Sequence, residues 1–241
     1  MKIRGIYIAP RWIVVGVGIL LALLLLGYLL FPGNPDIPPQ KAISQAILAT
    51  SGEPTYEYNI RMLTLIDGKE HQVSNVRGQR ENQNRIHIKG QIFDLDVDFY
   101  QIENTTYTKD QMTGEWITIS DNQINQQEIF MQELNPLVSF TYKELNDAKY
   151  TGTKKIDGRR LWVYTARPVV DNQYMELLWK DFEYVFWIEP RTLLIYNAKV
   201  TAVSKNKPAD RLTLAVEFRN YNGDIEVKPP VGVKQKGTPK Y

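Results

Sequence analysis

The stretch that decides the fold is FEYVFWIEPRTLLIYNAKVTA, residues 182–202. Large apolar and aromatic residues run without interruption over 184–188 and again over 193–196. The residues between them, 189–191, indicate a tight turn, so the pattern predicts two antiparallel strands. A sheet with one solvated face would alternate apolar and polar residues. These strands are apolar on both faces, which indicates a two-sided core, a partner surface or a ligand cavity.

Apolar–polar alternation recurs on both sides of this stretch and predicts further short strands. The expected strands cover residues 55–66, 72–79, 84–89, 92–102, 105–109, 115–119, 159–167, 183–188, 192–203, 212–220 and 224–228. Helices are expected at 39–52, 122–135 and 174–180. Because strands and helices do not alternate, a doubly wound or TIM-barrel fold is disfavoured. The predicted fold class is α+β, mainly β: one antiparallel sheet or open barrel with two or three short helices.

The segment IFDLDVDFYQI, residues 92–102, alternates apolar residues with Asp94, Asp96 and Asp98. An EF-hand calcium loop would need glycine at its sixth position, where this chain has Phe99. The three aspartates therefore indicate the solvated outer face of a strand, and no calcium site is expected.

The N-terminal region contains one uncharged run of 20 residues, 12–31, which would span about 30 Å as a helix. Lys2, Arg4 and Arg11 precede this run, and their charge places a stub, residues 1–11, in the cytoplasm. The run is longer than the apolar region of a signal peptide, which covers about 7–15 residues. We expect an uncleaved single-pass anchor in the cell membrane, with a cleaved signal peptide or a buried helix as alternatives.

The rest of the chain is expected to lie outside the membrane in three parts. A proline-rich spacer covers 32–39, an extracytoplasmic domain covers 40–228, and a basic, disordered tail covers 229–241. The chain of 241 residues is 43% hydrophobic and 11% aromatic, which is typical of a folded protein. Its 29 basic and 27 acidic residues nearly balance.

The inventory of catalytic residue types is thin. Cysteine is absent, and His71 and His87 are the only histidines, both expected as ordinary solvated or half-buried residues. The sequence contains no nucleophile elbow, phosphate-binding loop, dinucleotide fingerprint or H-E-x-x-H zinc motif. Basic residues are not interleaved with aromatic ones, which disfavours a nucleic-acid partner. We expect no enzyme, catalytic residue, metal site or cofactor; a hydrolase of cell-envelope material is the weakest alternative.

Four segments together resemble a known superfamily. They are QKAISQAILATSG at 40–52, TYTKDQMTGEWITI at 106–119, KKIDGRRLWVYTARP at 154–168, and the opening stretch leading to LAVEFRNYNGDIEVKPP at 214–230. The residues that match its two recurring motifs are Trp187, Ile188, Glu189, Thr192, Leu193, Leu194, Glu217, Phe218, Tyr221, Asn222, Ile225 and Pro229. The chain resembles the LolA-like superfamily of lipid and lipoprotein carriers, which includes the LppX and LprG type and the RseB-type sensors.

The resemblance implies an unclosed antiparallel barrel wrapped around helices, whose concave apolar face holds acyl chains. The carriers are soluble or held by a lipidated cysteine, so a helical anchor here would restrict the domain to local lipid hand-off or envelope sensing. The uncharged run predicts the membrane as a partner, through 12–31, and the resemblance implies an acyl chain, lipid or lipoprotein as the ligand. The expected cavity-lining residues are Tyr58, Ile60, Leu95, Val97, Phe99, Trp162, Tyr164 and Phe186. The alternative is an interaction or signalling module that docks another envelope protein, with a filled core.

Overall fold

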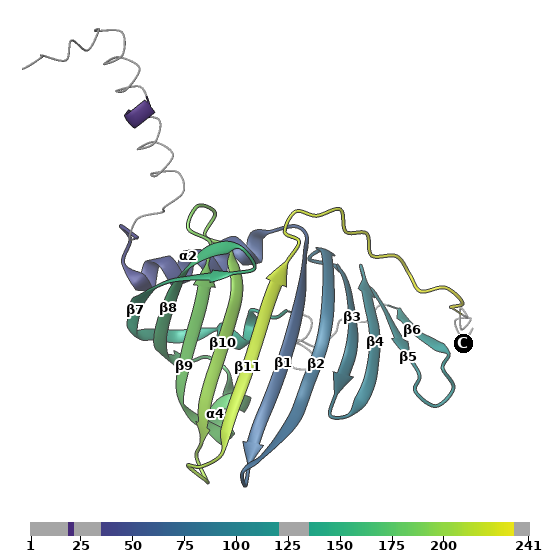
Figure 1. Ribbon diagram of the computed structural model, residues 1–241. Helices are drawn as coiled ribbons and strands as arrows, with labels where there is room; N and C mark the ends of the chain where they lie inside the picture. Colours follow the sequence, from purple (N-terminus) through teal and green to yellow (C-terminus); the bar gives the residue numbers. More distant parts are fainter. Residues whose placement is uncertain (1–18, 22–34, 121–134, 234–241) are drawn as a thin grey trace, which may run out of the picture. The chain divides into compact units, whose positions relative to one another are not determined.

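Eleven antiparallel strands form one sheet in the computed structural model of the chain (Figure 1). The structure describes residues 19–21, 35–120 and 135–233. The chain divides into two units, Met1–Asp36 and Ile37–Tyr241, and the sheet belongs to the second. The strand order is β6-β5-β4-β3-β2-β1-β11-β10-β9-β8-β7. The expected class, mainly β with an open antiparallel sheet and few helices, is confirmed.

The sequence order of the elements starts with helix α2 (Pro39–Gly52). The strands are β1 (Tyr56–Ile66), β2 (Lys69–Asn82), β3 (Arg85–Ile92), β4 (Leu95–Ile102), β5 (Thr105–Lys109), β6 (Trp116–Ser120), β7 (Tyr142–Ile156), β8 (Arg159–Val170), β9 (Trp179–Ile188), β10 (Ile195–Ser204) and β11 (Arg211–Arg219). A short 3-10 helix, η1 (Val138–Phe140), precedes β7, and helix α4 (Gln173–Leu178) lies between β8 and β9.

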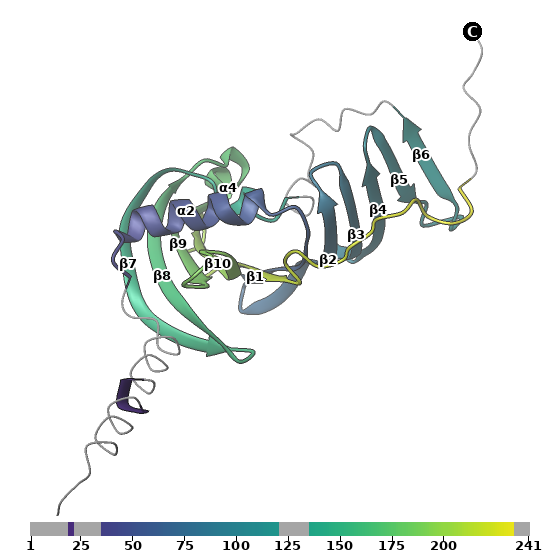
Figure 2. The same cartoon turned by 90° about the horizontal axis from the view of Figure 1, so that it is seen from above.

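Helix α2 lies across the part of the sheet formed by β7 to β1, which curves around it (Figure 2). Strands β2 to β6 continue the sheet away from the helix (Figure 2). The helix buries the small side chains of Ala42 and Ala46 beside Ile43, and small residues allow a helix to approach its neighbours closely. Thr50, also buried, accepts a hydrogen bond from the Ile195 amide of β10 at 3.0 Å. We call the side of the sheet that carries α2 the concave face and the opposite side the outer face.

The expected helix at 39–52 is found with the same bounds, and the expected helix at 174–180 corresponds to α4. The expected helix at 122–135 and the tail beyond 233 lie outside the described residues. The expected membrane span, 12–31, also lies outside them except for 19–21. Within the described ranges, no helix combines the length and apolar character needed to cross a bilayer.

The prediction of one continuous strand over 92–102 is wrong. Phe93 and Asp94 have φ angles of 49° and 63° and form a two-residue turn between β3 and β4. Positive φ at both central residues is what a type I′ hairpin requires, and it matches the twist of the flanking strands. Asp96 is exposed as expected, but Asp98 differs from the expected solvated face, because it is mostly buried and its carboxylate lies 2.9 Å from His87 Nε2.

Two further differences concern strands. Strand β7 was not among the expected strands, because it is an edge strand with mostly exposed side chains and carries little apolar alternation. Conversely, the strand expected at 224–228 does not form. This segment is extended but lies on the outer face, where Ile225 and Val227 pack with Ile102 of β4.

Side chains of β2 and β3 hold this C-terminal segment by its backbone. The Val227 amide donates to Glu81 Oε2 at 2.8 Å, and Arg85 Nη2 donates to the Val227 carbonyl at 2.6 Å. Arg85 Nε also donates to Glu81 Oε2 at 2.9 Å. The Val227 amide and the Arg85 guanidinium together hold the pKa of the Glu81 carboxyl below its usual value.

We predict that Glu81→Gln destabilises the fold by about 1 kcal/mol near pH 6. Because the folded-state pKa is lowered, the carboxylate stabilises the fold above the unfolded pKa of about 4.3, and this contribution is lost as the pH falls through the folded value. The measurement is urea unfolding of both proteins between pH 6 and pH 3. Glu70→Gln, at an exposed site on the same strand, is the control. An equal difference at every pH would contradict the assigned role of Glu81.

Candidate ligand-binding face

Strand register determines which side chains share the concave face, because directly opposed residues of antiparallel strands point to the same side. One row across the sheet runs from Tyr58 on β1 through Gly78 and Ile88 to Phe99 on β4. The ring of Tyr58 lies over Gly78, where a β-carbon would stand 2.0 Å from its Cζ atom. Glycine is therefore required at position 78, because only a residue without a side chain leaves room for the Tyr58 ring.

All eight residues expected to line a cavity lie on the concave face, as the pairings from β4 across the sheet to β8 show. They divide into two groups by burial. Four are buried in the core of the domain: Tyr58, Ile60, Tyr164 and Phe186. The other four keep part of their surface accessible: Leu95, Val97, Phe99 and Trp162.

The buried group lies where helical elements cover the sheet. Phe140 of η1 packs against Tyr184 and Phe186 of β9, with ring centroids 5.5 and 5.3 Å apart. The buried residues Ala42, Ile43 and Ala46 of α2 belong to the same core cluster as these rings. In this region the second apolar layer expected from the sequence is therefore the helical layer itself.

The accessible group lies on the strands that continue beyond the helix. Leu95 of β4 is 57% exposed, and Ile117 and Ile119 of β6 are 41% and 44% exposed on the same face. Ile117 and Ile119 were not among the expected lining residues, although the alternation WITIS at 116–120 carries the signal. These exposed aliphatic side chains lie on the same face of the sheet as the buried core.

Polar groups also reach the concave face, and sequence reasoning did not identify them. Arg80 of β2 is only 8% exposed, and its Nη1 donates to the Tyr56 hydroxyl at 2.8 Å. Its Nε atom is buried and has no hydrogen-bond partner among the described residues. The hydroxyl of Ser74 and the Trp162 Nε1 atom, on the same face, are also buried without a hydrogen-bond partner among the described residues.

Tyr164 and Tyr184, on neighbouring strands of the concave face, differ in how their hydroxyls are satisfied. Tyr184 donates to the carbonyls of Ser139 and Thr141 at 3.2 and 3.1 Å. The Tyr164 hydroxyl is buried without a hydrogen-bond partner in the described part of the chain. Burial raises the pKa of Tyr164 to about 12 and also raises the pKa of Tyr184, so both rings stay neutral at ordinary pH.

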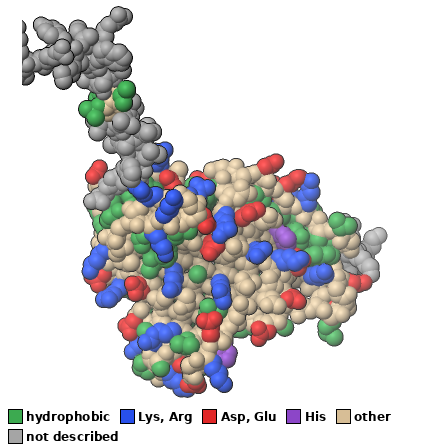
Figure 3. Space-filling view, in the orientation of Figure 1, with side chains coloured by type: hydrophobic (Ala, Val, Ile, Leu, Met, Phe, Trp, Pro, Cys, Tyr) green, Lys and Arg blue, Asp and Glu red, His purple; other side chains and the backbone are tan. Residues whose placement is uncertain are grey.

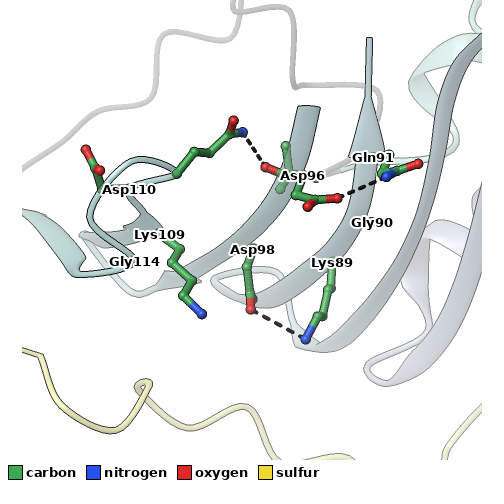
Figure 4. A pocket seen from close by; sticks show the side chains of 10 residues that line it. Lys89, Gly90, Gln91, Asp96, Asp98, Lys109, Asp110 and Gly114 are labelled. Carbon is green, nitrogen blue, oxygen red and sulfur yellow. Dashed lines mark hydrogen bonds and ion pairs between the residues drawn. The ribbon is translucent and has the colours of Figure 1, made fainter. Parts of the chain in front are cut away.

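The outer face has a different character. Charged side chains of both signs are interspersed over it (Figure 3). A hollow of about 540 Å³ between β3, β4 and β5 is lined by lysines and aspartates (Figure 4). Two of its charges pair with each other, since Lys89 Nζ lies 3.8 Å from Asp98 Oδ2, and the neutral Gln91 donates a hydrogen bond to Asp96 (Figure 4). In the ranges that the structure describes, no three His, Asp or Glu side chains are grouped so as to hold a metal ion.

Solved structures with the same architecture include the lipoprotein LppX of Mycobacterium tuberculosis. It aligns with a TM-score of 0.54 and 16% identity over 80% of this chain and all of LppX. LprF of Mycobacterium bovis aligns with a TM-score of 0.51 and 12% identity over 83% of this chain and all of LprF. No family model matches the sequence, and no curated protein matches it either. A fold of the LppX type, expected from the sequence, is confirmed by these two structures.

The two tyrosines give a paired test of the concave face. We predict that Tyr184→Phe lowers the free energy of unfolding by about 1 kcal/mol, because the buried Ser139 carbonyl loses the tyrosine donor and the Thr141 carbonyl keeps only the Asp171 amide. Tyr164→Phe should be neutral or stabilising in the absence of any added ligand, since it removes a buried hydroxyl that has no partner. Urea unfolding monitored by circular dichroism measures both. Equal destabilisation by the two substitutions would show that the Tyr164 hydroxyl is satisfied in solution.

Proposed function

We propose that the domain from residue 40 to 228 binds the acyl chain of a lipid or lipoprotein on its concave face. The observation that supports this proposal most directly is the apolar surface that leaves the buried core and continues onto Leu95, Ile117 and Ile119 as accessible side chains. An exposed apolar surface of this kind indicates a binding site, and an acyl chain is a ligand that would bury it against apolar groups. The protein then acts as a binding protein in lipid hand-off or envelope sensing.

The energetics favour an aliphatic ligand over a polar one. Burying an acyl chain contributes about 0.8 kcal/mol per CH₂ group, so a 14-carbon chain contributes about 11 kcal/mol before the entropic costs of binding. Leu95, Val97 and Phe99 offer aliphatic and aromatic contacts along one strand. The LolA-like resemblance supports the same face, because carriers of that superfamily hold acyl chains on the concave side of the sheet.

We further propose that residues 12–31 anchor the domain on the extracytoplasmic side of the cell membrane. The support is the uncharged run of 20 residues, its match to the thickness of a hydrocarbon core, and the basic residues that precede it. A helical anchor would tether the domain to the membrane, where lipids and lipoproteins are available. Binding there is compatible with short-range transfer and does not require a soluble shuttle.

Leu95 and Asp96 provide a matched test of the binding face, because they are adjacent and exposed on opposite faces of β4. We predict that Leu95→Lys weakens binding of a fluorescent fatty-acyl probe about fivefold, since it replaces roughly 1 kcal/mol of apolar contact with a charge. Asp96→Lys should leave binding unchanged. The measurement is probe titration of the full-length protein in non-ionic detergent, with circular dichroism to verify folding.

Two outcomes would contradict the lipid-binding proposal. The first is an absence of saturable probe binding to the wild-type protein, together with no co-purifying lipid in native mass spectrometry. The second is an equal effect of Leu95→Lys and Asp96→Lys, which would place the probe elsewhere. Crosslinking in membranes to one stoichiometric protein partner, with no lipid bound, would instead support the interaction-module alternative.

The anchor has its own test in cell fractionation. We predict that the wild-type protein remains in the membrane after alkaline carbonate extraction and that protease added outside the membrane digests its domain. Leu23→Arg combined with Leu24→Arg should release the protein, because each arginine at the centre of a spanning helix costs about 2.5–3.5 kcal/mol. A mature N-terminus beginning after residue 31 would show that the segment is cleaved instead.

A further inference from the structure

Arg80 is a buried cation on the concave face, and apolar ligand binding leaves its charge unexplained. It lies on β2, directly opposite Tyr56 of β1 and Ile86 of β3, and both of these neighbours are buried. Its side chain points to the same side of the sheet as Tyr58, Ile88 and Phe99. The guanidinium therefore lies at the border of the apolar surface.

The contacts of Arg80 do not neutralise its charge. Its Nη1 donates to the Tyr56 hydroxyl, and its Cζ lies 5.2 Å from the centroid of the Tyr56 ring. Its Nε has no hydrogen-bond partner, and no carboxylate of the described residues lies within 4 Å of the guanidinium. The adjacent acid, Glu81, is engaged with Arg85 and the Val227 amide.

A buried guanidinium without a counter-ion is energetically unfavourable. Arginine does not lose its proton inside proteins, and burial of an unpaired ion costs several kcal/mol. The Tyr56 hydroxyl cannot supply a negative charge, since burial raises the pKa of this tyrosine. The ring of Tyr56 offsets part of this cost through a cation–π contact with the guanidinium. The Nε donor of the guanidinium still has no acceptor among the described residues.

The surface beside Arg80 suits the rest of an amphiphile. The next concave positions along β2 are Gly78, Val76 and Ser74, and the last lies about 20 Å from Arg80 along the strand. Across β3 and β4 this direction is lined by side chains that include Ile88, Phe99 and Val97. Val76 and Ile88 are buried, so an acyl chain that starts at Arg80 would contact the partly accessible Phe99 and Val97 of β4 and reach the exposed Leu95, the first residue after the turn.

We propose that Arg80 binds the anionic headgroup, a carboxylate or a phosphate, of an amphiphile whose acyl chain lies on the concave face. This inference rests on the proposed function, because it assigns one end of the same ligand. A charge-assisted, bidentate pair with a planar guanidinium would fix the direction in which the chain lies. It would also select acidic lipids over neutral ones of equal chain length.

The test compares palmitic acid with its methyl ester, which has the same chain without the charge. Displacement of a fluorescent acyl probe from the full-length protein in non-ionic detergent measures both affinities. The wild-type protein should bind the acid about tenfold more tightly than the ester. Arg80→Gln should lose this preference and bind the ester as well as the wild type does. Arg77→Gln removes a charge from the exposed outer face of the same strand and should keep the preference.

The outcomes separate this inference from the proposed function. If acid and ester bind equally to the wild type, the role of Arg80 is wrong while acyl binding stands. If neither binds, both proposals fail. If only the ester affinity falls in Arg80→Gln, the residue shapes the apolar surface and does not bind an anion.

Three additional measurements complete the test. Unfolding in the absence of ligand should show Arg80→Gln to be at least as stable as the wild type, because an unpaired buried charge has been removed; a large loss of stability would assign Arg80 a structural role and overturn the proposal. Inorganic phosphate, followed by ³¹P NMR, should bind negligibly without an acyl chain. Lysophosphatidic acid should bind with the same dependence on Arg80 as palmitic acid. Tight binding of phosphate alone would identify a free-anion site and contradict a lipid headgroup.

Discussion

The arrangement of this domain depends on the packing of α2 against the concave side of a single antiparallel sheet. Ala42 and Ala46 let the helix approach the strands, and Thr50 accepts a hydrogen bond from the Ile195 amide at the far end of the contact. Among the described residues, α2 covers only the part of the eleven-stranded sheet that is formed by β7 to β1. The apolar pattern of the strands, however, extends over β4 and β6 as well. The apolar face is therefore wider than the part of the sheet that α2 covers. The uncovered strands carry the surface on which ligand binding is proposed.

The two faces of the sheet differ in how their charged and polar groups are paired. On the outer face, lysines and aspartates pair with one another, and the extended C-terminal segment is held by Glu81 and Arg85. This face can remain in water without any ligand. On the concave face, Arg80 is buried next to Tyr56 with an unsatisfied Nε, and the Tyr164 hydroxyl is also unpaired. Buried polar groups of this kind are uncommon in native proteins and need a reason. An acidic amphiphile would satisfy the charge of Arg80 and cover the exposed aliphatic side chains together.

Much of the fold could be predicted from local pattern. The period-two alternation at 55–66 became β1, the Asp67-Gly68 turn joined it to β2, and the amphipathic stripe at 39–52 became α2. Local pattern failed where the backbone or the environment overrode it. Phe93 and Asp94 adopt positive φ angles, so the alternation at 92–102 hid a turn. Strand β7 pairs with β8 and packs only partly buried residues against the core, so its sequence carries little signal.

The sequence by itself determined that the chain forms antiparallel strands with two apolar faces and that it contains an uncharged run long enough to span a bilayer. It also identified the eight aliphatic and aromatic candidates, because side-chain alternation assigns residues of one strand to common faces. Only the tertiary structure decided that these candidates share the concave face across strands, since register depends on pairing between distant segments. It alone showed that Tyr58, Ile60, Tyr164 and Phe186 are filled core while Leu95 remains accessible. The burial of Arg80 was likewise invisible in the sequence, because an arginine in a strand is normally solvated and the burial arises from neighbours on two other strands, β1 and β3.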